Sequence, residues 1–153
     1  MIRVLVPLDG SRLAERALGA LREVGGRSGA ELLLLRVVAP VNPVRLGRVA
    51  PSGPGRTLAA RRRIAKRYLV RVRDRMARRG FRARALVRAG DPAAQILKFA
   101  REEGVDLIAM STHGRSGLRR VLFGSVAEAV IRRTPLPLLV VRAGAARPRR
   151  RAP

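Results

Sequence analysis

The sequence predicts an α/β fold in which an open, doubly wound sheet of five parallel strands forms a single domain. Apolar runs of strand length alternate along the chain with segments whose apolar residues recur at helical spacing. Right-handed crossovers between successive strands turn such an alternation into a parallel sheet. A length of 153 residues suits one domain with a single core.

The expected strands are continuous or nearly continuous apolar runs, as is typical of parallel strands that are buried on both faces. The first run ends at Asp9-Gly10-Ser11, and the run after Val105 ends at Ser-Thr-His-Gly. The segment 82–88 mixes arginine with apolar residues, which indicates a weaker strand nearer an edge of the sheet. The expected strands span residues 2–8, 31–38, 82–88, 106–110 and 136–142.

Helical segments lie between these strands. The first starts near Ser11 and stops at Gly25-Gly26, and the second, which is strongly basic, runs from about 57 to 79 and is followed by Gly80. The third begins with Asp91-Pro92, an N-cap followed by proline in the first helical position, and the fourth spans about 125–133. The residues expected to face the core are Leu13, Ala14, Ala17, Leu18 and Leu21; Ile64, Tyr68, Val72 and Met76; and Ala93, Ile96, Leu97 and Ala100.

Two segments are expected to lie outside the packed core. Residues 39–56 are rich in proline and glycine, which predicts a loop. Residues 143–153 contain Arg-Pro-Arg-Arg-Arg, which predicts a basic, disordered tail. The folded domain is therefore expected to span residues 1–142.

The composition excludes several classes of site. The absence of cysteine excludes disulfides, metal thiolates and cysteine nucleophiles. No apolar run reaches the roughly 18 residues that a membrane span requires. Met1 leads straight into a strand-like segment, without the apolar block of a signal peptide. We therefore expect a cytoplasmic protein with no membrane partner.

The formal charge of +24 is carried almost entirely by arginine. One interpretation is a polyanionic partner such as nucleic acid. The other is a codon bias in a GC-rich genome, which replaces surface lysine by arginine. Proteins that bind single strands stack bases on aromatic rings, and the aromatic residues of this chain are limited to Tyr68, Phe81, Phe99 and Phe123. The second interpretation is favoured.

The segment 105–142 carries the pattern that is most informative about function. A short strand leads into a loop with Gly114 and Gly117, and then into Gly124-Ser125. Ser125 and Glu128 have the spacing of a capping box, which predicts the start of a helix. A helix N-terminus offers free N–H groups and a partial positive charge, so a glycine-bearing loop that feeds it can hold phosphate.

The spacing of these glycines resembles the signature of the universal stress protein family, Gly-x2-Gly-x9-Gly-Ser/Thr, which marks the ATP-binding members. Gly114 is followed by nine residues and then by Gly124-Ser125, with Ser111 in the place of the first glycine. The resemblance implies a Rossmann-like sheet of the adenine nucleotide alpha hydrolase type with strand order 3-2-1-4-5. The order then reverses between the first and fourth strands, where a ligand crevice is expected.

The resemblance also implies the residues of that crevice. Asp9 corresponds to the aspartate that contacts the ribose and lies near the metal, and Val37 to the position whose backbone contacts adenine. A plain Asx turn at Asp9 and an ordinary core role for Val37 remain open. The full implied set for ATP with Mg²⁺ or Mn²⁺ is Pro7, Leu8, Asp9, Val37, Met110, Ser111, His113, Gly114, Arg115, Gly124, Ser125 and Val126.

The remaining candidates have alternative roles. His113 is the sole histidine and lacks partners for a zinc site or a catalytic triad, so a role in ordering the loop is favoured. Arg115, Arg119 and Arg120 could bind phosphate oxygens or form a solvated basic surface. Ser111 places a Cβ where the family has none, which could crowd a nucleotide, although its hydroxyl could also donate a hydrogen bond.

The sequence therefore suggests an ATP-binding regulator of the stress response that is not primarily an enzyme, with slow ATP hydrolysis left open. The family commonly dimerises through its last strand, so a homodimer through residues 136–141 is expected. One alternative is a family member that has lost nucleotide binding and acts as a dimeric interaction module. Another is an arginine-rich protein that binds nucleic acid.

Overall fold

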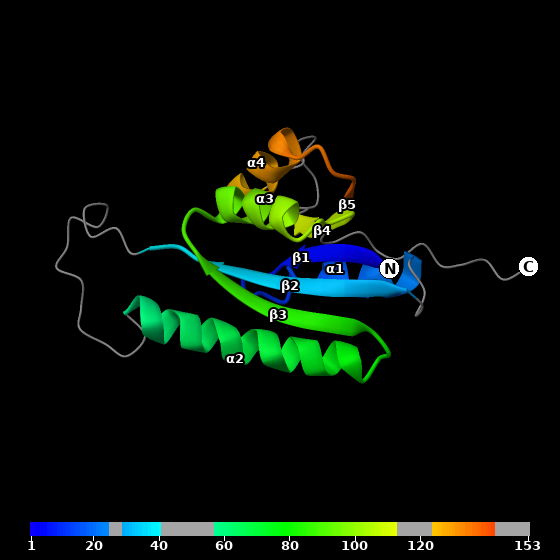
Figure 1. The fold of residues 1–153 in the computed structure, drawn as a ribbon, viewed down its shortest axis with the longest axis horizontal. Helices are drawn as coiled ribbons and strands as arrows, with labels where there is room; N and C mark the ends of the chain where they lie inside the picture. The colour runs from blue at the N-terminus through cyan, green and yellow to red at the C-terminus, as the bar shows by residue number, and fades with distance from the viewer. Residues whose placement is uncertain (25–28, 41–56, 113–123, 143–153) are drawn as a thin grey trace, which may run out of the picture.

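The computed structural model describes residues 1–24, 29–40, 57–112 and 124–142. Strands and helices alternate through these residues, with all strands parallel (Figure 1). The sheet order is β3-β2-β1-β4-β5, as the family resemblance implied. The elements are β1 Ile2–Pro7, α1 Arg16–Val24, β2 Ala30–Val38, α2 Leu58–Ala77, β3 Arg82–Ala89, α3 Pro92–Glu102, β4 Leu107–Thr112, α4 Ser125–Arg133 and β5 Leu138–Arg142.

The helices divide between the two faces of the sheet, so the fold is doubly wound as predicted. Figure 1 shows α3 and α4 together on one side of the sheet and α2 on the other. Alternate residues of the central strands pack on opposite layers: Val4 and Val6 lie in the cluster with α1 and α2, whereas Leu5 and Ile108 lie in the cluster with α3 and α4. The run Leu32–Leu35 is fully buried because β2 is covered on both faces.

The buried face of α2 differs from the predicted one. The expected line included Ile64, but the side chain of Ile64 is 55% exposed, and Tyr68 is half-buried. A line of residues spaced by four drifts about 40° around the helix at each step, because a turn contains about 3.6 residues. The helix instead buries a set that alternates four- and three-residue steps, Ala65, Leu69, Val72 and Met76.

The other helices begin and end largely where the sequence signals predicted. The Oδ1 atom of Asp91 accepts a hydrogen bond from the Ala94 amide at 2.8 Å, so Asp91 caps α3 as expected. Thr57 caps α2 in the same way through the Ala60 amide at 3.1 Å. Helix α1 is shorter than expected, because residues 11–15 form turns before the helix begins at Arg16.

The last two strands differ slightly from their predicted bounds. Strand β4 continues through Thr112, because Ser111 and Thr112 pair with Val141 and Arg142 of β5. Strand β5 begins at Leu138 rather than at Leu136, because two prolines that lack N–H groups flank Leu136. The predicted loop over 39–56 and the predicted tail over 143–153 fall mostly or wholly outside the described residues.

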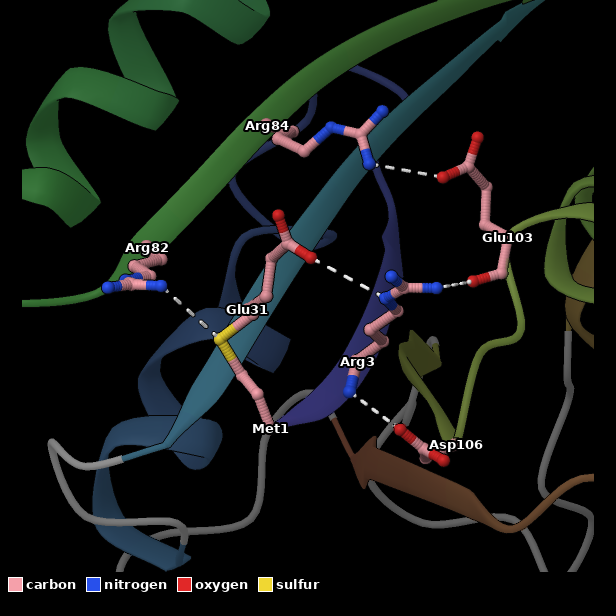
Figure 2. Close-up of polar contacts among 7 residues, drawn as sticks. All are labelled: Met1, Arg3, Glu31, Arg82, Arg84, Glu103 and Asp106. Atoms are coloured by element: carbon pink, nitrogen blue, oxygen red, sulfur yellow. Dashed lines mark hydrogen bonds and ion pairs between the residues drawn. The ribbon is translucent and has the colours of Figure 1, made fainter.

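Figure 2 shows polar contacts at the amino-terminal end of the sheet, around Arg3 on β1. The Arg3 amide donates to Asp106 Oδ2 at 2.7 Å, and its guanidinium donates to the Glu103 carbonyl at 2.6 Å. Its Nε atom lies 3.7 Å from the carboxylate of Glu31 on β2. These contacts join β1, β2 and the segment before β4 at the end of the sheet opposite to the candidate site.

Candidate functional site

A pocket of about 270 Å³ lies where the carboxyl ends of β1 and β4 meet the first turns of α3 and α4. Strands β1 and β4 are neighbours, with Val4 beside Leu107 and Leu5 beside Ile108. The sheet order reverses between these two strands, so the pocket occupies the switch point where open α/β sheets bind ligands. The topology therefore brings together segments that lie about a hundred residues apart in the sequence.

Every candidate residue within the described part of the chain lines this pocket. They come from the end of β1, from β2, from β4 and from the start of α4: Pro7, Leu8, Asp9, Val37, Met110, Ser111, Gly124, Ser125 and Val126. The predicted residues His113, Gly114 and Arg115, and also Arg119 and Arg120, lie outside the described residues.

Sequence reasoning missed the part of the pocket that comes from α3. Pro92 and Ile96 line the pocket, as do Ala14, Leu35 and Ala127. Asp91-Pro92 marked the start of α3 in the sequence, but no sequence signal showed that this helix start reaches the switch point. That position follows from the crossover that places α3 and α4 on the same face of the sheet.

The N-terminus of α4 is open to the pocket. Gly124, not Ser125, is the N-cap residue, and its carbonyl accepts the first helical hydrogen bond, from the Glu128 amide at 2.9 Å. Glycine has no side chain with which to cap, and no side-chain cap is formed here. The predicted capping box is therefore wrong: Ser125 is already inside the helix, and the Glu128 carboxylate instead accepts from Arg132 at 2.6 Å.

The lack of a capping side chain among the described residues favours an anion site at the start of α4. The first amides of a helix lack partners within the helix and carry a partial positive charge. A side chain bonded to them would compete with a ligand. Because none of the described side chains caps α4, its N-terminal amides remain available to a phosphate or carboxylate in the pocket.

Asp9 lies at the end of β1 and is held by the turn that follows it. Its Oδ1 atom accepts a hydrogen bond from the Ser11 amide at 2.8 Å, so the Asx turn left open by the sequence does form. Partial burial by itself would raise the pKa of Asp9, but hydrogen bonds from Ser11 and the charge of Arg36 outweigh it and hold the pKa below its ordinary value. Asp9 is therefore ionised at neutral pH.

A network of charged and polar side chains connects this turn with α2, and no pattern in the sequence predicted it. The Arg36 guanidinium lies over the Tyr68 ring, 5.5 Å from its centroid. The Tyr68 hydroxyl donates to Glu15 Oε1 at 2.9 Å, and Arg75 donates to the other oxygen of the same carboxylate. Burial and the hydrogen bond to Glu15 raise the pKa of Tyr68 above its ordinary value.

Ser111 belongs to β4 rather than to the loop. It pairs with Val141, and its hydroxyl donates a long hydrogen bond, 3.4 Å, to the Ala14 carbonyl. The hydroxyl therefore turns toward the segment before α1 while the residue still lines the pocket. The next side chain, Thr112, is 1% exposed, and its hydroxyl has no hydrogen-bond partner among the residues that the structure describes.

The described residues contain no group of three or more His, Cys, Asp or Glu side chains that could hold a metal ion. Asp9 is the one ionisable side chain among the described residues that line the pocket. None of the described helices is both long and apolar enough to span a membrane.

The fold and the sequence have clear relatives among known proteins. Universal stress protein YxiE of Bacillus subtilis is 31% identical over 145 residues, covering 92% of this chain and 98% of that protein. Universal stress protein MJ0577 of Methanocaldococcus jannaschii is 37% identical over 78 residues, covering 51% of this chain and 48% of that protein. Its solved structure matches with a TM-score of 0.70 at 26% identity over 95% of this chain and 98% of that one.

A more distant solved structure shares the fold. It is a universal stress protein family member from Arabidopsis thaliana with AMP bound, with a TM-score of 0.64 at 17% identity over 95% of this chain and 94% of that one. The sequence model of the Universal stress protein family matches residues 1–142. On this match and on the near-complete alignment with YxiE, the chain belongs to the universal stress protein family.

Proposed function

We propose that the pocket binds an adenine nucleotide, ATP with Mg²⁺ or Mn²⁺, and that the protein is a nucleotide-dependent regulator of the stress response. The observation that carries the proposal is the uncapped N-terminus of α4, which opens into the same pocket as Asp9. A relative of the same fold holds AMP. At 17% identity that relative supports only the choice of molecule to be tested.

The pocket lining suits the two ends of a nucleotide. Leu8, Leu35, Val37 and Ile96 offer apolar surface for a flat base. The amides at the start of α4 and the Ser125 hydroxyl offer donors for phosphate oxygens. The Asp9 carboxylate can accept from ribose hydroxyls. A few charge-assisted hydrogen bonds and burial of the base favour binding, and the entropy cost of association opposes it. The net binding free energy is about −6 to −8 kcal/mol, which corresponds to an affinity in the micromolar range.

The described residues fit a metal that arrives with the nucleotide. Mg²⁺ usually keeps several waters and is held by one or two carboxylates together with substrate phosphates. Asp9, ionised and partly exposed, can supply one such ligand. The bound cation would neutralise phosphate charge, while the α4 amides and Asp9 orient the nucleotide.

The same chemistry favours binding over hydrolysis. A general base should have a pKa near the working pH, whereas the pKa of Asp9 is lowered and the carboxylate is a weak base. No other described side chain in the pocket can ionise. We therefore propose a binding protein and not primarily an enzyme.

Isothermal titration calorimetry with ATP and Mg²⁺ tests the proposal. We expect a micromolar Kd for the unmodified chain and an affinity about 10- to 100-fold weaker for Asp9→Asn, since a charge-assisted hydrogen bond contributes about 1.5–3 kcal/mol. Asp106→Asn is the matched control, because it removes one carboxylate at the opposite end of the sheet (Figure 2). Equal affinity of the two variants would argue against this site.

The second candidate is a dimeric interaction module without nucleotide binding. The observation that favours it is that Ser111, which has a Cβ where the family signature has glycine, lines the pocket. Ser111→Gly separates the two candidates. If the unmodified chain binds no ATP and Ser111→Gly does bind it, the Cβ of Ser111 is what prevents nucleotide binding, and the second candidate is supported. Equal micromolar binding of ATP by the unmodified chain and by Ser111→Gly supports the nucleotide proposal.

A further inference from the structure

The outward face of α2 and its C-cap residue carry a line of arginines, Arg63, Arg67, Arg71 and Arg78, which we name the α2 arginine stripe. All four side chains are exposed. At about 100° per residue they fall on the side of the helix opposite to its buried face. That buried face consists of Ala65, Leu69, Val72 and Met76. The stripe extends over about 22 Å of helix axis at a rise of roughly 1.5 Å per residue.

The charges of the stripe are not neutralised within the described part of the chain. None of its four guanidinium groups makes a hydrogen bond or ion pair there. The acidic residue of α2, Asp74, accepts from Arg73 at 2.7 Å. Glu15, which also accepts from Tyr68 of α2, is bound by Arg75. The nearby carboxylates therefore pair with other arginines and leave the stripe free.

Such an arrangement is unfavourable for the isolated protein. Like charges spaced by four residues on a helix repel each other and destabilise it. Arg63, Arg67 and Arg71 repeat this spacing. Some other surface arginines do have acidic partners, as Arg88 has Glu102 at 3.1 Å and Arg132 has Glu128 at 2.6 Å. A polyanion laid along α2 would relieve the repulsion and release its own counterions.

The chemistry of this face distinguishes among polyanions. Single-stranded nucleic acid is held by aromatic stacking as well as charge, but the aromatic side chain of α2, Tyr68, is half-buried and bonded to Glu15. Surface-binding membrane helices insert an apolar face, but the apolar face of α2 is packed in the core. Duplex phosphates, with one charge per about 1.7 Å of axis, need neither.

We propose that the α2 arginine stripe binds the phosphate backbone of double-stranded nucleic acid without reading its sequence. Phosphate contacts position a protein on a duplex, whereas base-edge contacts specify sequence. The stripe offers four phosphate contacts and lies on α2, separate from the pocket residues. The proposal therefore does not depend on nucleotide binding.

The test measures binding of the 153-residue chain to fluorescein-labelled duplexes of two unrelated sequences by anisotropy, between about 50 and 200 mM salt. Equal affinity for both sequences is expected. Each lost phosphate contact should flatten the slope of log K against log salt by about 0.9, so replacing all four stripe arginines by glutamine should flatten it by about 3.6. At roughly 100 mM salt, that variant should bind at least tenfold more weakly.

The control variant replaces four other exposed arginines, Arg16, Arg22, Arg101 and Arg133, by glutamine. It has the same net charge as the stripe variant, and both keep the arginines of residues 143–153. A third variant with lysine at the four stripe positions retains the charge and should retain the salt slope. Circular dichroism checks that α2 is folded in each variant.

Several results would overturn the proposal. One is an equal loss of duplex affinity in the stripe and control variants, which would mean that net charge alone is responsible. Another is tighter binding to a single strand of the same length, or stripe-dependent binding to phosphatidylserine vesicles with none to duplex. A flat salt response of the unmodified chain would also exclude it.

Discussion

The guanidinium of Arg36, on β2, lies against Gly10, in the space that a Cβ at Gly10 would occupy. Gly10 has a φ of +90°, a conformation that residues with a Cβ adopt only with strain. Arg36 also lies over the ring of Tyr68 and contributes to the lowered pKa of Asp9. A residue without a side chain thus allows β2, α2 and the turn at Asp9 to meet beside the pocket.

Gly10→Ala is therefore expected to destabilise the protein by about 1–3 kcal/mol, mainly through the strained backbone. The flexible end of Arg36 can move aside, but it would then lose its position over the Tyr68 ring and its electrostatic interaction with Asp9. Urea denaturation measures the change in free energy of unfolding. Gly19→Ala is the control, because Gly19 lies within α1 with open space around it, and there alanine should stabilise by roughly 0.5–1 kcal/mol. Unchanged stability of Gly10→Ala would contradict the strain argument.

The lowered pKa of Asp9 predicts how its charge affects stability with pH. A carboxyl group whose pKa is lower in the folded state than in the unfolded state stabilises the fold when the pH is above its unfolded-state pKa, which is near 3.8. That contribution to stability is lost as the pH falls through the pKa of the group in the folded state. Asp9→Asn can keep the hydrogen bond from the Ser11 amide while removing the charge. The stability difference between the two chains should thus be largest near neutrality and shrink below about pH 4, and a difference independent of pH would refute the prediction.

Tyr68 offers a clean spectroscopic probe, because it is the only tyrosine in a chain without tryptophan. Burial, the hydrogen bond to Glu15 and the Glu15 charge raise its pKa. Ultraviolet absorbance of tyrosinate should therefore show ionisation well above the ordinary value of 10 in the folded protein. Glu15→Gln should lower the midpoint, since it removes the negative charge, whereas Glu128→Gln on α4 should not.

The cap of α3 should contribute measurably to stability. Asp91→Ala removes the side-chain acceptor of the Ala94 amide and should cost about 0.5–2 kcal/mol. Asp91→Asn keeps an acceptor in the same place and should cost much less. Thermal or urea unfolding of the two variants makes the comparison, and equal losses would mean that charge rather than capping matters at this position.

Homodimerisation through β5 remains an expectation from the family resemblance. Strand β5 lies at the edge of the sheet and pairs only with β4 among the described strands. An apolar edge of this kind needs covering. Val140 is half-buried and belongs to neither core cluster, so Val140→Lys should disrupt an interface without disturbing the core.

Analytical ultracentrifugation at micromolar concentrations should show a dimer for the unmodified chain and a shift toward monomer for Val140→Lys. Ile64→Lys, at an exposed apolar position on α2, should leave the dimer intact. A monomer for the unmodified chain would remove the expectation.

The sequence by itself determined the strands and helices, and it determined the pocket residues that come from the end of β1, from β2, from β4 and from the start of α4. Buried parallel strands produce apolar runs, and turn and cap residues such as Asp91-Pro92 act locally, so their signals can be read from neighbouring residues. The spacing from Gly114 to Gly124-Ser125 indicated the family, and the strand order followed from that resemblance.

Only the tertiary structure decided which side chains meet. Gly124 rather than Ser125 occupies the N-cap position of α4, Ala65 and Leu69 rather than Ile64 enter the core, and Arg36 reaches both Gly10 and Tyr68. These outcomes depend on crossover handedness, helix rotation and packing between segments far apart in the chain, which are set by the free energy of the whole core and leave no local pattern.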